Sequence, residues 1–180
     1  MVILIGGSSH VGKTLLAQKL MEELHIPYVS LDHLKMAFIR TGRTELTVED
    51  DVPMRYFLWP FAAEMCKTAI ENEQNLIVEG CYIPDTWRES FAPAYLQAIR
   101  CVFVGMSEPY LRAHFDDVQR HANAIEHRLP ETLDLERLIR CSAGMKEDAN
   151  QAGFPYLEID GTYDVERIYR ELKEKLGLEA

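Results

Sequence analysis

Short apolar runs alternate along the chain with longer segments in which apolar residues recur every three or four positions. Short runs of this kind are typical of strands buried on both faces of a sheet, whereas the longer period is typical of amphipathic helices. The pattern predicts strands over residues 2–5, 28–31, 76–78, 101–104 and 156–159. Strands that alternate with helices build βαβ units, so we expect an α/β fold of about five parallel strands covered by helices on both faces.

Helical patterns fill the segments between these runs. We predict helices after residue 12, over 34–40, from about 47 to 73, from 108 to about 125, over 132–152 and from about 165 onward. The sequence from Thr47 to Asp50 fits a capping box at the start of the third of these helices. Pro60 lies inside that helix and predicts a kink or a division. Ser107 predicts a helix start, and Gly153 predicts a helix end.

The length and charge of the chain limit what it can be. With 180 residues, it fits a single domain over residues 1–180. The net charge of −10 argues against nucleic acid and anionic membrane as partners. The first apolar run ends at Gly6 and is too short for a signal peptide or a membrane span. The four cysteines have no metal-ligand spacing, and reduced thiols are typical of a cytoplasmic protein.

One motif carries specific chemistry, and it lies between the first predicted strand and the first predicted helix. The spacing G-x-x-x-x-G-K-[ST] is matched in full by Gly7, Ser8, Ser9, His10, Val11, Gly12, Lys13 and Thr14. The glycines let successive backbone N–H groups point at phosphate oxygens, and the helix that follows adds its positive end. The lysine reaches the β- and γ-phosphates and the threonine hydroxyl ligates Mg²⁺. The motif therefore predicts a site for ATP and Mg²⁺.

With this motif and element order, the chain resembles the small P-loop kinases. The resemblance is to the nucleotide, shikimate and gluconate kinase group, and more closely to chloramphenicol-phosphotransferase and zeta-toxin-like proteins. It implies a three-layer P-loop NTPase fold and an ATP-dependent kinase that phosphorylates a small molecule. It also implies acceptor-binding segments at about 33–60 and 81–95, and a short lid at about 120–135.

Two carboxylates end predicted strands at the edge of the sheet where such proteins bind ligands. In the chloramphenicol-phosphotransferase-like group, an acid at the position of Asp32 accepts the proton of the attacking hydroxyl. A neutral hydroxyl must lose a proton as it attacks, so a carboxylate within hydrogen-bond reach is required. Glu79 is the candidate to hold Mg²⁺ or bind substrate. The alternatives are that Asp32 caps a helix and that Glu79 is an ordinary acid at the end of a strand.

Arginines are candidates for the remaining contacts. In the small kinases, a lid arginine stabilises the transferring phosphoryl group. Here that region contains Arg120, Arg128 and Arg137, of which Arg128 is our first candidate and Arg120, as a contact to the nucleotide, the second. Three more arginines fall in the acceptor segments and could bind an anionic acceptor, namely Arg40, Arg55 and Arg88. The alternative for each is a solvated charge on a helix surface.

The sequence leaves three functions open. The first is phosphoryl transfer to a small-molecule acceptor. The second is a regulatory module that binds or hydrolyses a nucleoside triphosphate, although the Asn-Lys-x-Asp motif of switch GTPases is absent. The third is a toxin-like kinase of a nucleotide sugar, or a kinase of a protein. The turn over residues 160–162 is where we expect the edge of the adenine, and the chain could be a monomer or a homodimer.

Overall fold

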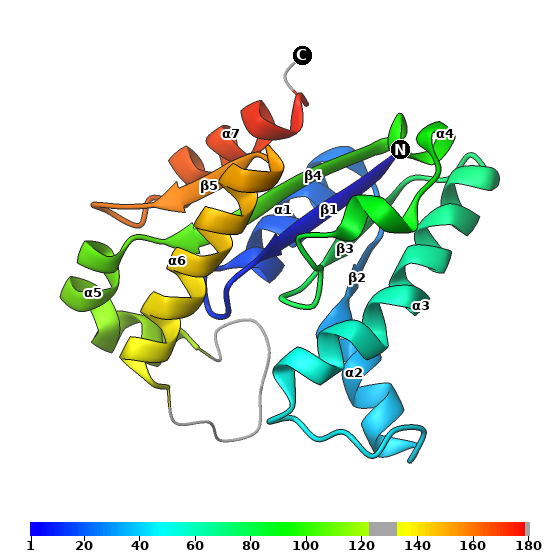
Figure 1. Ribbon diagram of the computed structural model, residues 1–180. Helices are drawn as coiled ribbons and strands as arrows, with labels where there is room; N and C mark the ends of the chain where they lie inside the picture. The colour runs from blue at the N-terminus through cyan, green and yellow to red at the C-terminus, as the bar shows by residue number, and fades with distance from the viewer. Residues whose placement is uncertain (123–132, 179–180) are drawn as a thin grey trace.

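A computed structural model of the chain describes residues 1–122 and 133–178. Its centre is a sheet of five parallel strands (Figure 1). Their spatial order is β2 (Tyr28–Ser30), β3 (Leu76–Glu79), β1 (Val2–Gly7), β4 (Ile99–Met106) and β5 (Tyr156–Ile159). All five predicted strands and their parallel arrangement are confirmed. Strand β4 extends two residues beyond the prediction at each end, and at its start the exposed Arg100 interrupts the apolar run.

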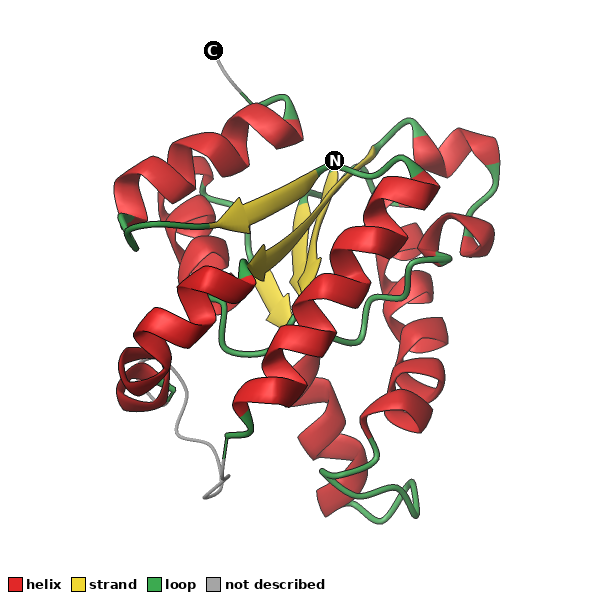
Figure 2. Ribbon diagram, turned by 60° about the vertical axis from the view of Figure 1, so that its left-hand side comes forward, coloured by secondary structure: helices red, strands yellow, loops and turns green. Residues whose placement is uncertain are grey.

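The two faces of the sheet are covered by different helices, which gives three layers (Figure 2). Helices α1 (Lys13–Leu24) and α7 (Val165–Leu176) pack on one face, and α3 (Asp51–Glu71) and α6 (Leu135–Ala152) lie on the other. Helix α5 (Glu108–His121) lies beyond the carboxyl ends of the strands, against α6. The alternation along β1 fits this division. Ile3 and Ile5 belong to the core beneath α1 and α7, whereas Val2 and Leu4 belong to the core beneath α3. Every residue of β1 is buried.

The second and third helices begin at other residues than predicted. Helix α2 (Leu31–Arg40) follows β2 directly, so Asp32 lies in its first turn. The capping-box prediction is wrong, because the Asp50 carboxylate accepts hydrogen bonds from the backbone and hydroxyl of Thr47 in a turn that precedes α3. Helix α3 then starts at Asp51 and passes through Pro60 as one helix, so the predicted division does not occur.

Later helix boundaries agree more closely with the sequence. The Ser107 hydroxyl accepts a hydrogen bond from the Tyr110 backbone N–H at 3.1 Å and caps α5. Helix α6 ends at Gly153, which has φ 67°. Two short helices were not predicted, η1 (Trp87–Ser90) and α4 (Pro93–Leu96). Over the two described ranges, none of the helices has the length and apolar character that a membrane span needs.

This topology determines where a ligand can bind. Strand β1 lies between β3 and β4. The chain leaves β1 toward α1 on one face, whereas the segment after β3 and helix α6, which follows β4, cover the other face. In open parallel sheets, such switch points form a crevice at the carboxyl ends of the strands. Residues 7–14, which carry the glycine-rich motif and which we call the phosphate loop, begin at the end of β1, so this loop lies at the switch point. The first residues of α3 and α6 lie at the same end of the molecule (Figure 1).

Candidate functional site

The loop between β1 and α1 needs its glycines for steric reasons. Gly7 has φ 131°, and a Cβ atom there would lie 2.0 Å from the Val104 carbonyl oxygen of β4. Gly12 has φ 89°, so it also has a conformation that disfavours any other residue. His10 has φ 61° in the same loop. Close approach to β4 and a left-handed backbone thus explain the two fixed glycines of the motif.

The lysine and the other loop residues have distinct environments. Lys13 is only 7% exposed, and its ammonium donates to the Ser8 carbonyl at 2.7 Å. The Ser8 side chain is buried, and Val11 packs into the core beneath α1. Ser9 is half-buried. The loop therefore holds its ammonium inside its own curve, where phosphate oxygens are expected to bind.

The two predicted metal ligands lie together. The Thr14 hydroxyl donates to a carboxylate oxygen of Glu79 at 3.3 Å, joining the start of α1 to the end of β3. Glu79 is 2% exposed. Mg²⁺ prefers oxygen ligands and is typically held by one or two protein groups together with substrate phosphates. A hydroxyl and a buried carboxylate beside the phosphate loop fit that donor set.

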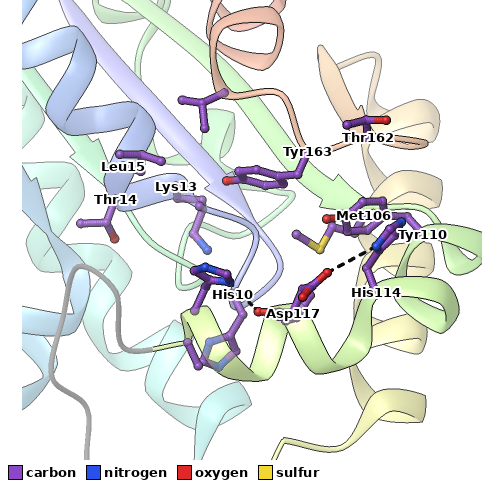
Figure 3. Close-up of a pocket in the computed structure, with 15 residues that line it drawn as sticks. His10, Lys13, Thr14, Leu15, Met106, Tyr110, His114, Asp117, Thr162 and Tyr163 are labelled. Atoms are coloured by element: carbon purple, nitrogen blue, oxygen red, sulfur yellow. Dashed lines mark hydrogen bonds and ion pairs between the residues drawn. The ribbon is translucent and has the colours of Figure 1, made fainter.

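A cavity of about 650 Å³ opens beside the phosphate loop (Figure 3). Its walls are the loop, the end of β4, one side of α5 and the segment between β5 and α7. The lining residues that bear polar or aromatic groups are His10, Lys13, Thr14, Tyr110, His114, Asp117, His121, Thr162 and Tyr163. The cavity is large enough for a nucleotide and reaches from the loop toward α5.

Aromatic side chains form much of the cavity wall. The rings of Tyr110 and His114 stack with centroids 4.6 Å apart, and His114 lies 3.6 Å from Asp117. Tyr163 lies over the loop, with its hydroxyl 2.2 Å from where a Cβ of Gly12 would be. Burial raises the pKa of Tyr163, which keeps its phenol protonated. The turn over residues 160–162, where we expect the edge of the adenine, contributes Thr162 to the cavity wall. Asp160 of the same turn accepts a hydrogen bond from the Ser107 hydroxyl at 2.6 Å.

A second polar group, on α2, α3 and the segment after β3, lies on the other side of the phosphate loop. Lys35 donates to Asp32 at 2.6 Å and to the Tyr82 hydroxyl at 2.9 Å. Tyr82 donates to Asp51 at 3.4 Å, and Asp51 pairs with Arg137 at the start of α6. Burial raises the pKa of Tyr82, so this phenol remains a donor. We call Asp32, Lys35, Asp51, Tyr82 and Arg137 the acceptor-side cluster.

The Cys81 thiol links the acceptor-side cluster to the phosphate loop. Burial raises its pKa, and four charged groups lie close enough to modify that pKa. Those groups are Lys13 of the phosphate loop and Asp32, Asp51 and Lys35 of the cluster. The chain from Glu79 to Tyr82 also joins these two half-sites by direct contact, because Glu79 accepts from the Thr14 hydroxyl at 3.3 Å and the Tyr82 hydroxyl accepts from Lys35 at 2.9 Å.

The structure brings few of the predicted arginines to this centre. Arg40 is exposed at the end of α2. Arg55 borders a small pocket with Asp85 and Asp148. Arg88 donates to the Ala152 carbonyl at 3.4 Å, at the end of α6 that leads into β5.

The two lid candidates have different outcomes. Arg120 is exposed and pairs with Asp117, a residue of the cavity wall. Arg128 lies outside the described residues, as do residues 123–132 of the predicted lid. Arg137, just beyond that segment, joins the acceptor-side cluster instead. The roles of Arg40, Arg55, Arg88, Arg120 and Arg128 stay predictions.

Several residues of the site had no distinct signal in the sequence. Lys35 and Asp51 resemble any exposed charge on an amphipathic helix. Ser142 of α6, whose hydroxyl lies 2.8 Å from the hydroxyl of Ser8, resembles any small helix residue. They meet the site only because α2, α3 and α6 converge on the carboxyl edge of the sheet. Tyr163 is the exception, since an aromatic residue directly after the turn at residues 160–162 could have been identified as a wall of the cavity.

Solved structures of small kinases have the same architecture. A gluconokinase from Sinorhizobium meliloti 1021 is 20% identical, with 98% of this chain and 91% of that chain covered and a TM-score of 0.57. Shikimate kinase from Aquifex aeolicus vf5 is 17% identical, with 98% and 96% covered and a TM-score of 0.55. Shikimate kinase from Bacteroides thetaiotaomicron is 16% identical, with 99% of both chains covered and a TM-score of 0.54. No protein-family model and no curated protein matches the sequence.

Proposed function

From the fold of the small P-loop kinases, we propose that this chain transfers the γ-phosphoryl group of ATP to a hydroxyl of a small molecule. One observation carries the proposal. The segment from Glu79 to Tyr82 contacts the Thr14 hydroxyl at one end and Lys35, the partner of Asp32, at the other, so a triphosphate and a hydroxyl could be held beside each other. A module that only binds nucleotide needs the first half-site and has no use for the second.

The phosphate loop would bind the triphosphate. Backbone N–H groups of residues 7–14 and the Lys13 ammonium would contact the phosphates, and the cavity beneath α5 would take the nucleoside. Lys13 would exchange the Ser8 carbonyl for phosphate oxygens. Thr14 and Glu79 would hold Mg²⁺. Bound there, Mg²⁺ would neutralise part of the charge of the triphosphate.

Asp32 would accept the proton of the attacking hydroxyl. As the bond between the acceptor oxygen and the γ-phosphorus forms, the bond from that phosphorus to the β–γ bridging oxygen breaks, and ADP leaves. The hydroxyl proton passes to the Asp32 carboxylate, and the Lys13 ammonium balances charge on the transferring group. Lys35 holds one oxygen of Asp32 at 2.6 Å, which directs the carboxylate toward this task. Arg128 or Arg120 would supply further positive charge.

The other candidate functions make different predictions. A regulatory nucleotide-binding module would bind ATP tightly and release ADP slowly, whatever acceptor is added. A toxin-like kinase of a nucleotide sugar would use the same chemistry with a larger acceptor.

The test measures ADP release with ATP, Mg²⁺ and a panel of acceptors that includes nucleosides, sugar acids and antibiotics. One acceptor should stimulate the wild-type protein strongly. Asp32→Asn should lower that stimulated rate by about a hundredfold or more while ATP affinity stays nearly unchanged, because the carboxylate acts only on the hydroxyl. Lys13→Ala should lower both the stimulated rate and the affinity for ATP.

Two results would contradict the proposal. Full activity of Asp32→Asn would remove the assigned base. Tight ATP binding without stimulation by any acceptor, macromolecular acceptors included, would favour the regulatory module.

A further inference from the structure

Helix α6 contacts the phosphate loop through a buried serine, Ser142. Ser142 is 3% exposed, and its hydroxyl lies 2.8 Å from the hydroxyl of Ser8, the second residue of the phosphate-loop motif. Ser8 is itself 1% exposed. The two residues are 134 positions apart in the sequence, so only the tertiary fold brings them together.

The Ser142 hydroxyl joins two walls of the nucleotide cavity. Its oxygen accepts a hydrogen bond from the Met106 backbone N–H at 3.4 Å, at the end of β4. A serine hydroxyl has one donor proton and two acceptor lone pairs, so the Ser142 oxygen can accept from β4 and still share a hydrogen bond with Ser8 in either direction. Met106 lines the cavity, and Ser8 begins the loop that faces it. One hydroxyl thus ties the loop to the neighbouring strand.

Ser8 in turn determines where the phosphate-binding lysine lies. Its backbone N–H donates to the Val104 carbonyl at 3.1 Å, and its own carbonyl accepts from the Lys13 ammonium at 2.7 Å. The loop that follows contains His10 at φ 61°, a conformation that is uncommon for a residue with a side chain and needs support from its surroundings. The Ser142 contact is the side-chain anchor of Ser8 in this arrangement.

We propose that Ser142 is a positioning residue for the triphosphate site. Its hydroxyl holds the phosphate loop in the conformation that binds phosphate before the nucleotide arrives. The inference rests on the proposed function and adds a residue of α6 to its nucleotide site. Preorganisation of a loop lowers the conformational entropy lost on binding, so losing the anchor costs affinity. The ligand is a nucleoside triphosphate with Mg²⁺, and the affinity that Ser142 supports is that of the loop for its phosphates.

The test is the affinity of purified variants for ATP with Mg²⁺, measured by isothermal titration calorimetry. Ser142→Ala should weaken binding about threefold to tenfold, the range expected when one buried hydrogen bond is lost. Ser142→Thr keeps the hydroxyl and should recover most of the affinity. The double variant Ser8→Ala with Ser142→Ala should lose no more than the larger single loss, because both changes remove the same contact.

Tyr156→Phe is the matched control for a purely structural effect. Its hydroxyl donates to the Ser142 backbone carbonyl at 3.2 Å, so the variant disturbs the same helix turn without touching the loop. We expect Tyr156→Phe to lower thermal stability and leave ATP affinity unchanged.

The outcomes separate the two proposals. If Lys13→Ala abolishes ATP binding but Ser142→Ala binds like wild type, the role of Ser142 is refuted and the proposed function stands. Equal affinity losses in Ser142→Ala and Tyr156→Phe would likewise refute it, because a general disturbance of α6 would explain both. Losses that add in the double variant would show that the two serines act separately. A wild-type protein that does not bind ATP with Mg²⁺ would overturn both proposals.

Discussion

At the scale of single residues, the site depends on charges that neutralise one another in pairs. Lys35 and Asp32 are 13% and 16% exposed in their side chains, so neither is fully solvated. A half-buried carboxylate without its partner cation would be costly to keep ionised. The ion pair with Lys35 therefore holds the proposed base in one orientation.

Lys35→Met tests this pairing. The variant removes the ammonium while keeping a long side chain, so Asp32 loses both its partner and its orientation. We expect the acceptor-stimulated rate to fall about tenfold, which corresponds to about 1.4 kcal/mol, with ATP affinity unchanged. The rate and the affinity are measured by ADP release and by calorimetry.

Lys67→Met is the control for Lys35→Met. Lys67 pairs with Glu64 at 2.7 Å with the same spacing of three residues, but Glu64 is 71% exposed. This change should leave the rate at the wild-type value. A wild-type rate in Lys35→Met as well would show that Asp32 does not depend on its lysine.

At the scale of secondary-structure elements, α6 contacts both half-sites. Its Ser142 bonds to the phosphate loop, and its Arg137, just over one helical turn earlier, pairs with Asp51 on α3. Helix α7 has a comparable role on the other side, because it begins directly after Thr162 and Tyr163 of the cavity wall. The starts of helices thus position much of the site.

The start of α7 gives a prediction about stability. The Asp164 carboxylate accepts hydrogen bonds from the backbone N–H groups of Glu166 and Arg167 at 3.0 and 3.2 Å, which caps the helix. Asp164→Ala should lower the free energy of unfolding by about 1 kcal/mol in urea denaturation. Asp164→Asn, which can still cap, should lose much less. Equal losses in both variants would show that charge, and not the capping oxygen, stabilises the helix start.

At the scale of the whole molecule, the two cores on either side of the sheet exclude charge. Burial raises the pKa of the Cys66 thiol in α3 to about 12, from an ordinary value of 9.0. In the unfolded chain this thiol ionises near its ordinary value. Between about pH 9 and 12 the unfolded state therefore loses a proton that the folded state keeps, and ionisation favours unfolding.

Stability should accordingly fall with rising pH in this window. One such thiol contributes a slope of about 1.4 kcal/mol per pH unit at most. Cys66→Ala should make the fall in unfolding free energy shallower, and Cys141→Ala, at an exposed position, should not change it. Denaturant titrations at several pH values measure both slopes, and identical slopes in wild type and Cys66→Ala would contradict the burial of an uncharged thiol.

The sequence by itself determined the five strands, their parallel arrangement and the phosphate loop. These features are local, since an apolar run of four residues or a G-x-x-x-x-G-K-[ST] spacing carries its physical reason within a few positions. Gly7 and Gly12 are required by their own backbone angles, and Thr14 follows from the motif alone. The start of α3 could not be predicted, because the Thr47 and Asp50 contacts form equally well in a turn.

Only the tertiary structure decided which residues surround the phosphate loop. Lys35, Asp51, Arg137 and Ser142 each lie on a helix surface that the sequence presents as ordinary, and their partners are distant in the chain. The order β2-β3-β1-β4-β5 brings the ends of those helices to one edge of the sheet. A contact between distant residues leaves no local periodicity, and for that reason the phosphate site could be identified from the sequence while its supporting groups required the fold.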